Sequence, residues 1–136
     1  MKRTHVITGS ASGIGAATAR RLTAQGYKVI GVDIRDADVV ADLSTPQGRA
    51  EMIEQVRALA PEGIDGVLTS AGSSDMKRPG FVVALNYFGT IEVLEGLHPI
   101  LRKPGARCVA VSSVGMLDAK YPSGLNRLPR LRSERS

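Results

Sequence analysis

Residues 8–15 read Thr-Gly-Ser-Ala-Ser-Gly-Ile-Gly and join an apolar run at 5–8 to a helical pattern at 13–25. A glycine-rich turn between a strand and a helix is the setting in which such a motif binds phosphate. The free N–H groups and the positive end of the helix dipole both attract a pyrophosphate. The competing interpretation is a glycine-containing turn with no ligand. We predict a dinucleotide site that includes Gly9, Ser12, Gly13, Ile14 and Gly15.

The three glycines of this turn have different expected roles. Gly9 allows the tight turn that leaves the strand, and Gly13 lets the backbone approach a pyrophosphate without a Cβ in the way. Gly15 lets the helix pack closely on the sheet. The spacing is Gly-x-x-x-Gly-x-Gly, which differs from the commoner Gly-x-Gly-x-x-Gly.

Apolar runs and helical patterns alternate along the chain. Glycine and proline separate them, with Gly26 after the first helix and Pro61 after the second. This order predicts right-handed βαβ crossovers and a parallel sheet with helices on both faces. We expect strands at 5–8, 28–33, 39–42, 64–70 and 107–112, and helices at 13–25, 44–60 and 80–101.

Asp33 ends the second expected strand, where an acid binds the adenosine ribose hydroxyls in dinucleotide sites. Its carboxylate would repel a 2′-phosphate, so the sequence favours NAD over NADP. Arg35 follows two residues later and is able to pair with such a phosphate, which keeps NADP as the alternative. Asp33 as a simple strand-end cap is the other interpretation.

The net charge of +5 is concentrated near the C-terminus. Residues 1–119 hold 13 Lys or Arg and 12 Asp or Glu, whereas residues 120–136 hold 5 basic residues and 1 acidic residue. The basic charge therefore forms no patch on the expected fold, and with two Phe and three Tyr in all, we expect no nucleic-acid partner. We expect 1–119 to be an incomplete dinucleotide-binding Rossmann domain and 120–136 a basic, disordered tail.

The remaining composition points to a reducing compartment. No apolar run approaches the roughly 18 residues of a membrane span, so no membrane association is expected. Cys108 is the single cysteine and allows no intrachain disulfide, which suits a cytoplasmic location. We expect Cys108 to be a buried strand residue. His5 and His98 lack the spacing of metal ligands, so no metal is expected.

The glycine turn has the form found in short-chain dehydrogenases/reductases, and further segments resemble that family over residues 1–119. Asp42-Leu43 resembles the family's acid after the third strand, which contacts adenine, and Ala71-Gly72 stands within its Asn-Asn-Ala-Gly region. The resemblance implies that Asp42, Leu43, Ala71 and Gly72 contact the cofactor. It also implies a doubly wound α/β sheet with strand order 3-2-1-4-5, here truncated after the fifth strand.

Two segments resemble the family's catalytic region. Asn86-Tyr87-Phe88-Gly89 is similar to the region of the active-site asparagine, and Val111-Ser112-Ser113 to the strand that ends in the catalytic serine. The resemblance implies catalytic roles for Asn86 and Ser113. Residues 32–38, 41–45 and 86–89 are also similar to bacterial NAD-dependent 3α-hydroxysteroid dehydrogenase/carbonyl reductases.

The family's proton-transfer pair, Tyr-x-x-x-Lys, has no counterpart in this sequence. Tyr121 is followed four residues later by Leu125, and no lysine follows Lys120. The resemblance implies an oxidoreductase acting on secondary alcohols or ketones, such as hydroxysteroids or carbonyl compounds, and often a homo-oligomer. Because general acid–base catalysis contributes about 10²–10⁴-fold, we expect impaired activity. The alternative is a non-catalytic NAD-binding fragment or the remnant of a frameshifted gene.

Overall fold

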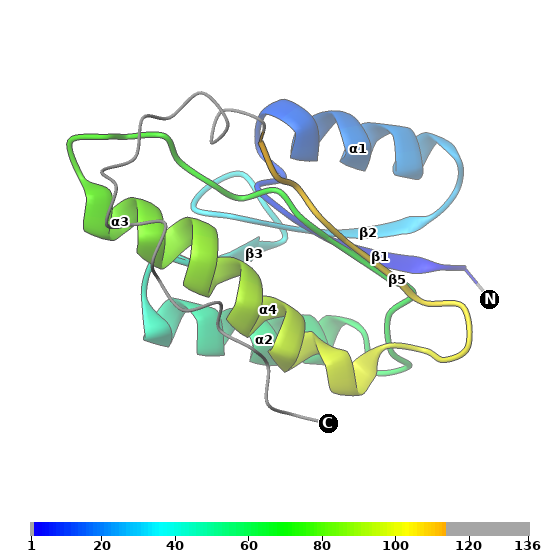
Figure 1. The fold of residues 1–136 in the computed structure, drawn as a ribbon. Helices are drawn as coiled ribbons and strands as arrows, with labels where there is room; N and C mark the ends of the chain where they lie inside the picture. The colour runs from blue at the N-terminus through cyan, green and yellow to red at the C-terminus, as the bar shows by residue number, and fades with distance from the viewer. Residues whose placement is uncertain (1, 114–136) are drawn as a thin grey trace.

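The computed structural model describes residues 2–113 and shows the predicted alternation of strands and helices (Figure 1). The expected tail at 120–136, with Tyr121, lies outside the described residues. The strands are β1 (Thr4–Thr8), β2 (Lys28–Asp33), β3 (Val39–Val40), β4 (Gly66–Thr69) and β5 (Arg107–Ala110). The helices are α1 (Gly13–Ala24), α2 (Pro46–Leu59), α3 (Pro79–Val83) and α4 (Gly89–Leu97), with a π-helical turn η1 (Ala84–Phe88) and a 3₁₀ turn η2 (His98–Ile100).

All five strands form one parallel sheet in the order β3-β2-β1-β4-β5, which confirms the predicted fold. Helix α1 covers one face, and α2 lies with α3 and α4 on the other (Figure 1). β1 pairs with both β2 and β4, so the strand order reverses beside it. In open α/β sheets a ligand crevice forms at this reversal, outside the carboxyl ends of the strands. The glycine turn follows β1 directly at this position.

The main hydrophobic core lies between the sheet and the α2–α4 layer. Helix α2 begins at a capped end, because Thr45 Oγ1 accepts a hydrogen bond from the Gly48 N–H at 3.0 Å and Pro46 follows. In this helix Leu59 is exposed, whereas Arg49 is buried. The core includes Val6, Val32, Val67, Met52, Val56, Val93 and Leu97.

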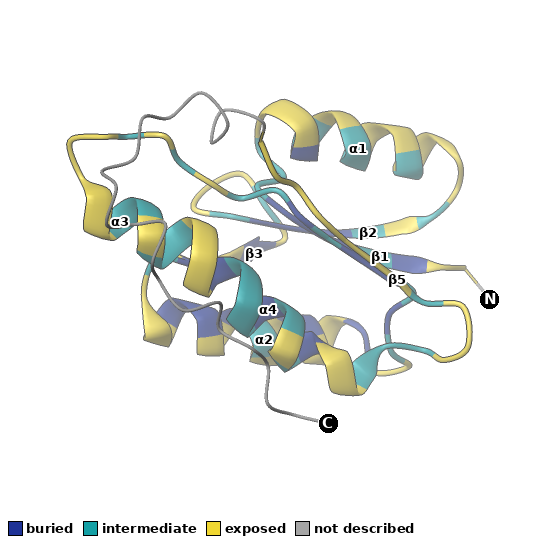
Figure 2. Cartoon of the chain, viewed as in Figure 1, coloured by how far each residue is buried: buried dark blue, intermediate teal, exposed yellow. Residues whose placement is uncertain are grey.

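Strand β5 differs from the other strands because all four of its residues are exposed (Figure 2). Among the described residues, no strand pairs with its outer edge. Cys108 is therefore exposed, and its prediction as a buried residue is wrong. Val109, on the opposite face of the strand, is 57% exposed. Sequence periodicity identifies an apolar strand but not whether both its faces are covered.

The long helix predicted at 80–101 is divided in the structure into α3, η1, α4 and η2. The Gly89 N–H bonds to the Ala84 carbonyl five residues earlier, which widens the helix at this point. By length and composition alone, the stretch Pro79–Ile100 would be able to cross a membrane, with mean hydropathy 1.2. Val93 and Leu97 of this stretch are fully buried in the core, and 17% of its most apolar window is buried.

Candidate cofactor site

A cavity of about 580 Å³ lies at the carboxyl ends of β1, β2 and β4. Its walls come from the glycine turn, from the loops after β2 and β3, and from the loop after β4. Segments far apart in the sequence thus share one crevice, at the expected reversal of the sheet. All ten predicted cofactor-binding residues line it: Gly9, Ser12, Gly13, Ile14, Gly15, Asp33, Asp42, Leu43, Ala71 and Gly72.

Glycine is required at two positions of the turn. Gly9 has a φ of 71°, and a Cβ there would lie 2.8 Å from the Ala71 nitrogen. At Gly15 a Cβ would collide with the Gly9 carbonyl and lie 2.8 Å from Ser70 Oγ. The turn, the first residues of α1 and the loop after β4 are therefore in direct backbone contact.

The N-terminus of α1 leaves donors available toward the cavity. Ser12, the cap residue, has an extended backbone, and its side chain makes no capping hydrogen bond. A Cβ on Gly13 would meet no atom within 4 Å, so the space beside the first turn is open. Free N–H groups, the helix dipole and open space together fit a pyrophosphate.

Two residues at the end of β2, Val32 and Asp33, stabilise the conformation of the glycine turn. The Val32 carbonyl accepts hydrogen bonds from the N–H groups of Gly9 at 2.8 Å and Ser10 at 3.3 Å. Asp33 Oδ2 accepts from the Ala11 N–H at 2.9 Å, and Asp33 Oδ1 accepts from the Ile34 N–H at 2.7 Å. A carboxylate has about four acceptor positions, so Asp33 keeps acceptor capacity toward the cavity that it lines.

The loop after β3 forms the neighbouring wall. Asp42 Oδ1 accepts hydrogen bonds from both the N–H and the hydroxyl of Ser44, at 2.9 and 2.6 Å. Leu43 lines the cavity but is only 3% exposed and belongs to the hydrophobic core. An apolar residue beside a fixed carboxylate suits a flat, partly polar ring such as adenine.

A single hydroxyl joins the ends of β1 and β4. Thr8 Oγ1 accepts from the N–H groups of Ser70 and Ala71, both at 3.1 Å. Ser70 Oγ donates in return to the Thr8 carbonyl at 2.6 Å. These bonds hold the start of the loop after β4 against the end of β1, beside the glycine turn.

The two predicted catalytic residues do not line this cavity. Asn86 lies in η1 with an exposed side chain that binds the backbone of Ser73 at both its N–H and its carbonyl. Ser73 itself lines the cavity, so Asn86 fixes the backbone of a lining residue without lining the cavity itself. Ser113 lies three residues beyond β5 and is exposed.

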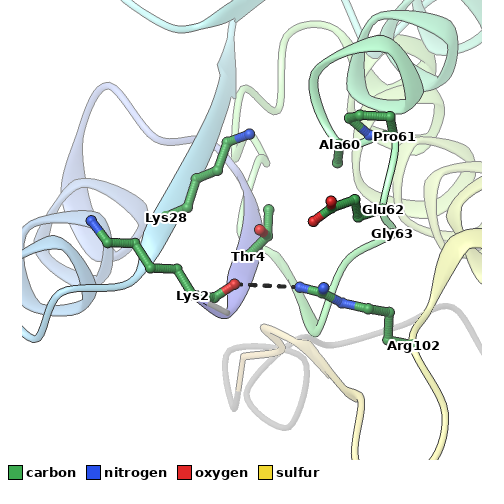
Figure 3. Close-up of a pocket in the computed structure, with 8 residues that line it drawn as sticks. All are labelled: Lys2, Thr4, Lys28, Ala60, Pro61, Glu62, Gly63 and Arg102. Atoms are coloured by element: carbon green, nitrogen blue, oxygen red, sulfur yellow. Dashed lines mark hydrogen bonds between the residues drawn. The ribbon is translucent and has the colours of Figure 1, made fainter.

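A second cavity, of about 450 Å³, lies near the amino ends of β1 and β2 (Figure 3). Two of its three cations bind other parts of the fold: Lys28 Nζ donates to the Leu59 carbonyl at 2.7 Å, and Arg102 Nη2 contacts the Lys2 carbonyl at 3.4 Å and Asp65 Oδ2 at 2.5 Å. This end of a parallel sheet is not where ligands of open α/β folds bind. We therefore assign it a structural role.

The charged groups beside that second cavity have shifted pKa values. Burial by itself raises the pKa of Asp65, but the Thr4 N–H and the Arg102 guanidinium outweigh it and lower the pKa below the ordinary 3.8. Burial lowers the pKa of His5 below its ordinary 6.5, although the nearby Asp65 charge opposes this effect. Both shifts favour the form of the residue that is present at neutral pH.

Sequence reasoning missed several residues of the cavity and its support. Ser73, Arg78, Phe81 and Leu85 also line the cavity. Arg78 lies 4.1 Å from the Phe81 ring centroid and donates to Asp75 at 2.8 Å. Arg49 supports the wall at Leu43 from the core side. Its helical spacing with Met52 and Val56 was the one available signal that it faces inward.

Comparison with known proteins places the chain in a family. A family model for short chain dehydrogenases matches residues 3–123, and the chain belongs to this family. It is 47% identical over 113 residues to a 3-alpha-hydroxysteroid dehydrogenase/carbonyl reductase of Comamonas testosteroni, covering 80% of this chain and 43% of that protein. It is 42% identical over 126 residues to a coniferyl-alcohol dehydrogenase of a Pseudomonas species, covering 88% of this chain and 47% of that protein.

Solved structures agree with these sequence comparisons. The crystal structure of a 3-alpha-hydroxysteroid dehydrogenase from Pseudomonas sp. B-0831, complexed with NADH, matches with a TM-score of 0.78 and 39% identity. The match covers 93% of this chain and 53% of that one. The chain thus spans about half the length of the relatives that it matches.

Proposed function

We propose that the cavity binds a nicotinamide dinucleotide, with the pyrophosphate at the N-terminus of α1. The observation that carries this proposal is the meeting of all ten predicted contact residues around one cavity at the sheet reversal. Gly9, Gly13 and Gly15 would admit the pyrophosphate to the backbone N–H groups. The NADH complex of the similar Pseudomonas sp. B-0831 enzyme supports this assignment.

We infer that NAD is preferred over NADP. Asp33 lines the cavity at the end of β2 and would accept hydrogen bonds from ribose hydroxyls. A 2′-phosphate in the same position would face this carboxylate at short range, which costs binding energy. Arg35 also lines the cavity and is the residue that would support NADP binding if the preference were reversed.

The activity we propose for the protein is oxidation of a secondary alcohol or reduction of the corresponding ketone. The bound nicotinamide would supply or accept the hydride. Asn86 would orient the cavity wall through Ser73, and Ser113 would orient the substrate oxygen. The relatives named for hydroxysteroid and coniferyl-alcohol dehydrogenation suggest bulky, largely apolar substrates. We place this function in the cytoplasm.

A second candidate function is cofactor binding without turnover. The observation that favours it is chemical: none of the tyrosines in the sequence, Tyr27, Tyr87 and Tyr121, is followed four residues later by lysine. A protein made of these 136 residues alone would lack the usual donor for the proton of the substrate oxygen, and its turnover would be slower by about 10²–10⁴-fold.

Calorimetric titration with NADH tests the binding proposal. A Gly13→Ala change adds a methyl group in the pyrophosphate space, and Gly105→Ala is its matched control. Both glycines have positive φ and open surroundings, but only Gly13 lines the cavity. We expect NADH to bind the wild type and Gly105→Ala alike, and Gly13→Ala at least about tenfold more weakly, because a phosphate–N–H bond is lost. Equal affinity in all three proteins would refute the proposed site.

A ketone-reduction assay on the same preparations separates the two candidate functions. NADH consumption that depends on an added ketone supports the dehydrogenase, and NADH binding without consumption supports the cofactor-binding protein.

A further inference from the structure

Arg49 is a buried cation whose guanidinium reaches three separate segments of the chain. It is 4% exposed. Nη1 donates to the Leu43 carbonyl at 2.9 Å and contacts the Ala84 carbonyl at 3.4 Å, and Nε forms an ion pair with Glu92 at 2.5 Å. A buried charge is tolerated only when it is paired and hydrogen-bonded, so this geometry is strongly specified.

The first of these contacts fixes the wall at Leu43. Leu43 lines the cavity and is 3% exposed, and its carbonyl accepts a hydrogen bond from Arg49. The wall is also tightly packed from behind, because a Cβ on Gly89 would lie 3.3 Å from the Leu43 carbonyl. Gly89 is the residue whose N–H closes the π-helical turn on Ala84. The Leu43 wall and η1 are therefore in direct contact.

The second contact, with the Ala84 carbonyl, connects Arg49 to the cavity wall at Ser73. Ala84 begins η1, and Asn86 lies within the same turn. Asn86 Oδ1 accepts from the Ser73 N–H at 2.8 Å, and Asn86 Nδ2 donates to the Ser73 carbonyl at 2.9 Å. Ser73 lines the cavity in the loop after β4. Side chains and one helical turn thus connect Leu43 to Ser73 without passing through the cavity.

We propose that Arg49 is a positioning residue. It fixes the position of the cavity wall at Leu43 relative to the cavity wall at Ser73. Arg49 does not line the cavity, and its guanidinium binds the Leu43 and Ala84 carbonyls and the Glu92 carboxylate, so in this scheme it touches no ligand. A nucleotide that packs on Leu43 restrains the Leu43 carbonyl. Because Arg49 binds both this carbonyl and the Ala84 carbonyl, the nucleotide also restrains η1, the turn that contains Asn86. The inference rests on the proposed nucleotide site. It adds that a nucleotide bound against Leu43 also reduces the motion of Ser73.

Hydrogen exchange of the Ser73 amide, read by NMR on the full chain, tests this role. The probe is AMP, which lacks the nicotinamide half of the cofactor. In the wild type we expect AMP to slow exchange at Ser73 as well as at Leu43. In Arg49→Met we expect Ser73 to exchange on the order of tenfold faster without nucleotide, because the fixing bonds are lost. AMP should no longer slow it.

A matched control and a conservative variant complete the experiment. Arg57 lies on the same helix, is exposed and contacts a carbonyl of α4, that of Gly96 at 3.4 Å. In Arg57→Met, AMP should slow exchange of the Ser73 amide as it does in the wild type. Arg49→Lys keeps a charge for Glu92 but has one nitrogen in place of Nε and Nη1, so it cannot bind the carboxylate and both carbonyls together. AMP should therefore not slow exchange at Ser73 in this variant either. The Val67 amide in β4 reports global stability in every variant.

The outcomes distinguish this inference from the proposed function. The inference is overturned if the Ser73 amide exchanges at the wild-type rate in both Arg49 variants. It is also overturned if AMP still slows exchange at Ser73 in both variants. If AMP leaves the amides of Gly13 and Leu43 unaffected in the wild type, the nucleotide site itself is wrong. Faster exchange at Ser73 and Val67 by the same factor would mean that Arg49 contributes only to global stability, which also overturns the inference.

Discussion

Asn86 and Ser73 form a reciprocal pair, in which one carboxamide satisfies both the N–H and the carbonyl of one residue. The pair connects η1 to the loop after β4, across 13 residues of sequence. A Cβ on Gly72 would lie only 3.2 Å from Asn86 Oδ1, so this loop passes close to the carboxamide. The residue implied by family resemblance to be catalytic thus has a defined structural partner.

Replacing the Asn86 carboxamide with a carboxylate should weaken cofactor binding. In Asn86→Asp the group that donates to the Ser73 carbonyl becomes a second acceptor, and the two oxygens repel. Loss of a bond of this kind costs about 1–3 kcal/mol, so we expect roughly a 5- to 150-fold loss in NADH affinity by calorimetry. Gln55→Glu, an amide-to-acid change at an exposed position of α2, should leave the affinity unchanged. Wild-type affinity in Asn86→Asp would show that the Ser73 wall does not contact the cofactor.

Neutralising Asp33 should change the preference between the two dinucleotides. Asp33→Asn removes the charge that opposes a 2′-phosphate and leaves Arg35 to attract it. We expect the ratio of NADPH to NADH affinity to rise by about tenfold or more, measured by competitive titration. Asp36→Asn removes the same charge from the exposed residues after β2, outside the cavity, and is the control. An equal change in both variants would indicate a long-range charge effect rather than recognition by Asp33.

The ion pair of Asp65 and Arg102 should make stability depend on acid pH. Because the pKa of Asp65 is lowered in the folded state, the unfolded chain binds its proton first as the pH falls. The stabilisation by Asp65 is therefore complete above about pH 5 and is lost as the pH falls through the lowered pKa. In urea denaturation, the difference in unfolding free energy between wild type and Asp65→Asn should be largest near neutral pH and shrink below pH ~4.

A second variant tests the origin of this pH dependence. Arg102→Gln should show the same shrinking difference, because it removes the partner that lowers the pKa. His5 acts in a higher window: its lowered pKa means that its contribution is present above pH ~6.5 and declines below that value. A difference for Asp65→Asn that stays constant down to pH 3 would contradict the assignment.

The exposure of β5 predicts unequal effects of the same substitution on neighbouring strands. Val67 in β4 is 4% exposed and Val109 in β5 is 57% exposed. Val67→Ala removes buried methyl groups and should lower the free energy of unfolding by about 1.5–2.5 kcal/mol. Val109→Ala should change it by no more than about 0.5 kcal/mol. Comparable losses in urea denaturation would show that β5 is covered in solution.

The fold was predictable because its signals are local. The bounds of β2 match the prediction, and α1 and α2 differ from it by one or two residues at their ends. Capping by Thr45 and Pro46, and the glycine turn after β1, act within a few residues of sequence. The ten cofactor contacts were predicted to share a site, and the structure brings them around one cavity.

The features that were not predicted depend on contacts between distant segments. The π-helical turn forms where Gly89 packs on Leu43, and nothing within 84–89 indicates it. The inward orientation of Arg49 was not predicted, and its partners Ala84 and Glu92 lie 35 and 43 residues away. The exposure of Cys108 depends on which elements lie beside β5, and a strand pattern does not carry that information.

The hydrogen bonds from Gly9 and Ser10 to Val32, and from Ala11 to Asp33, have a consequence for protein engineering. They mean that the shape of the glycine turn is encoded partly in the next strand, more than 20 residues downstream. Grafting residues 8–15 alone into another α/β scaffold should therefore transfer the motif without its conformation. The smallest portable unit is the complete β1–α1–β2 segment with its aspartate.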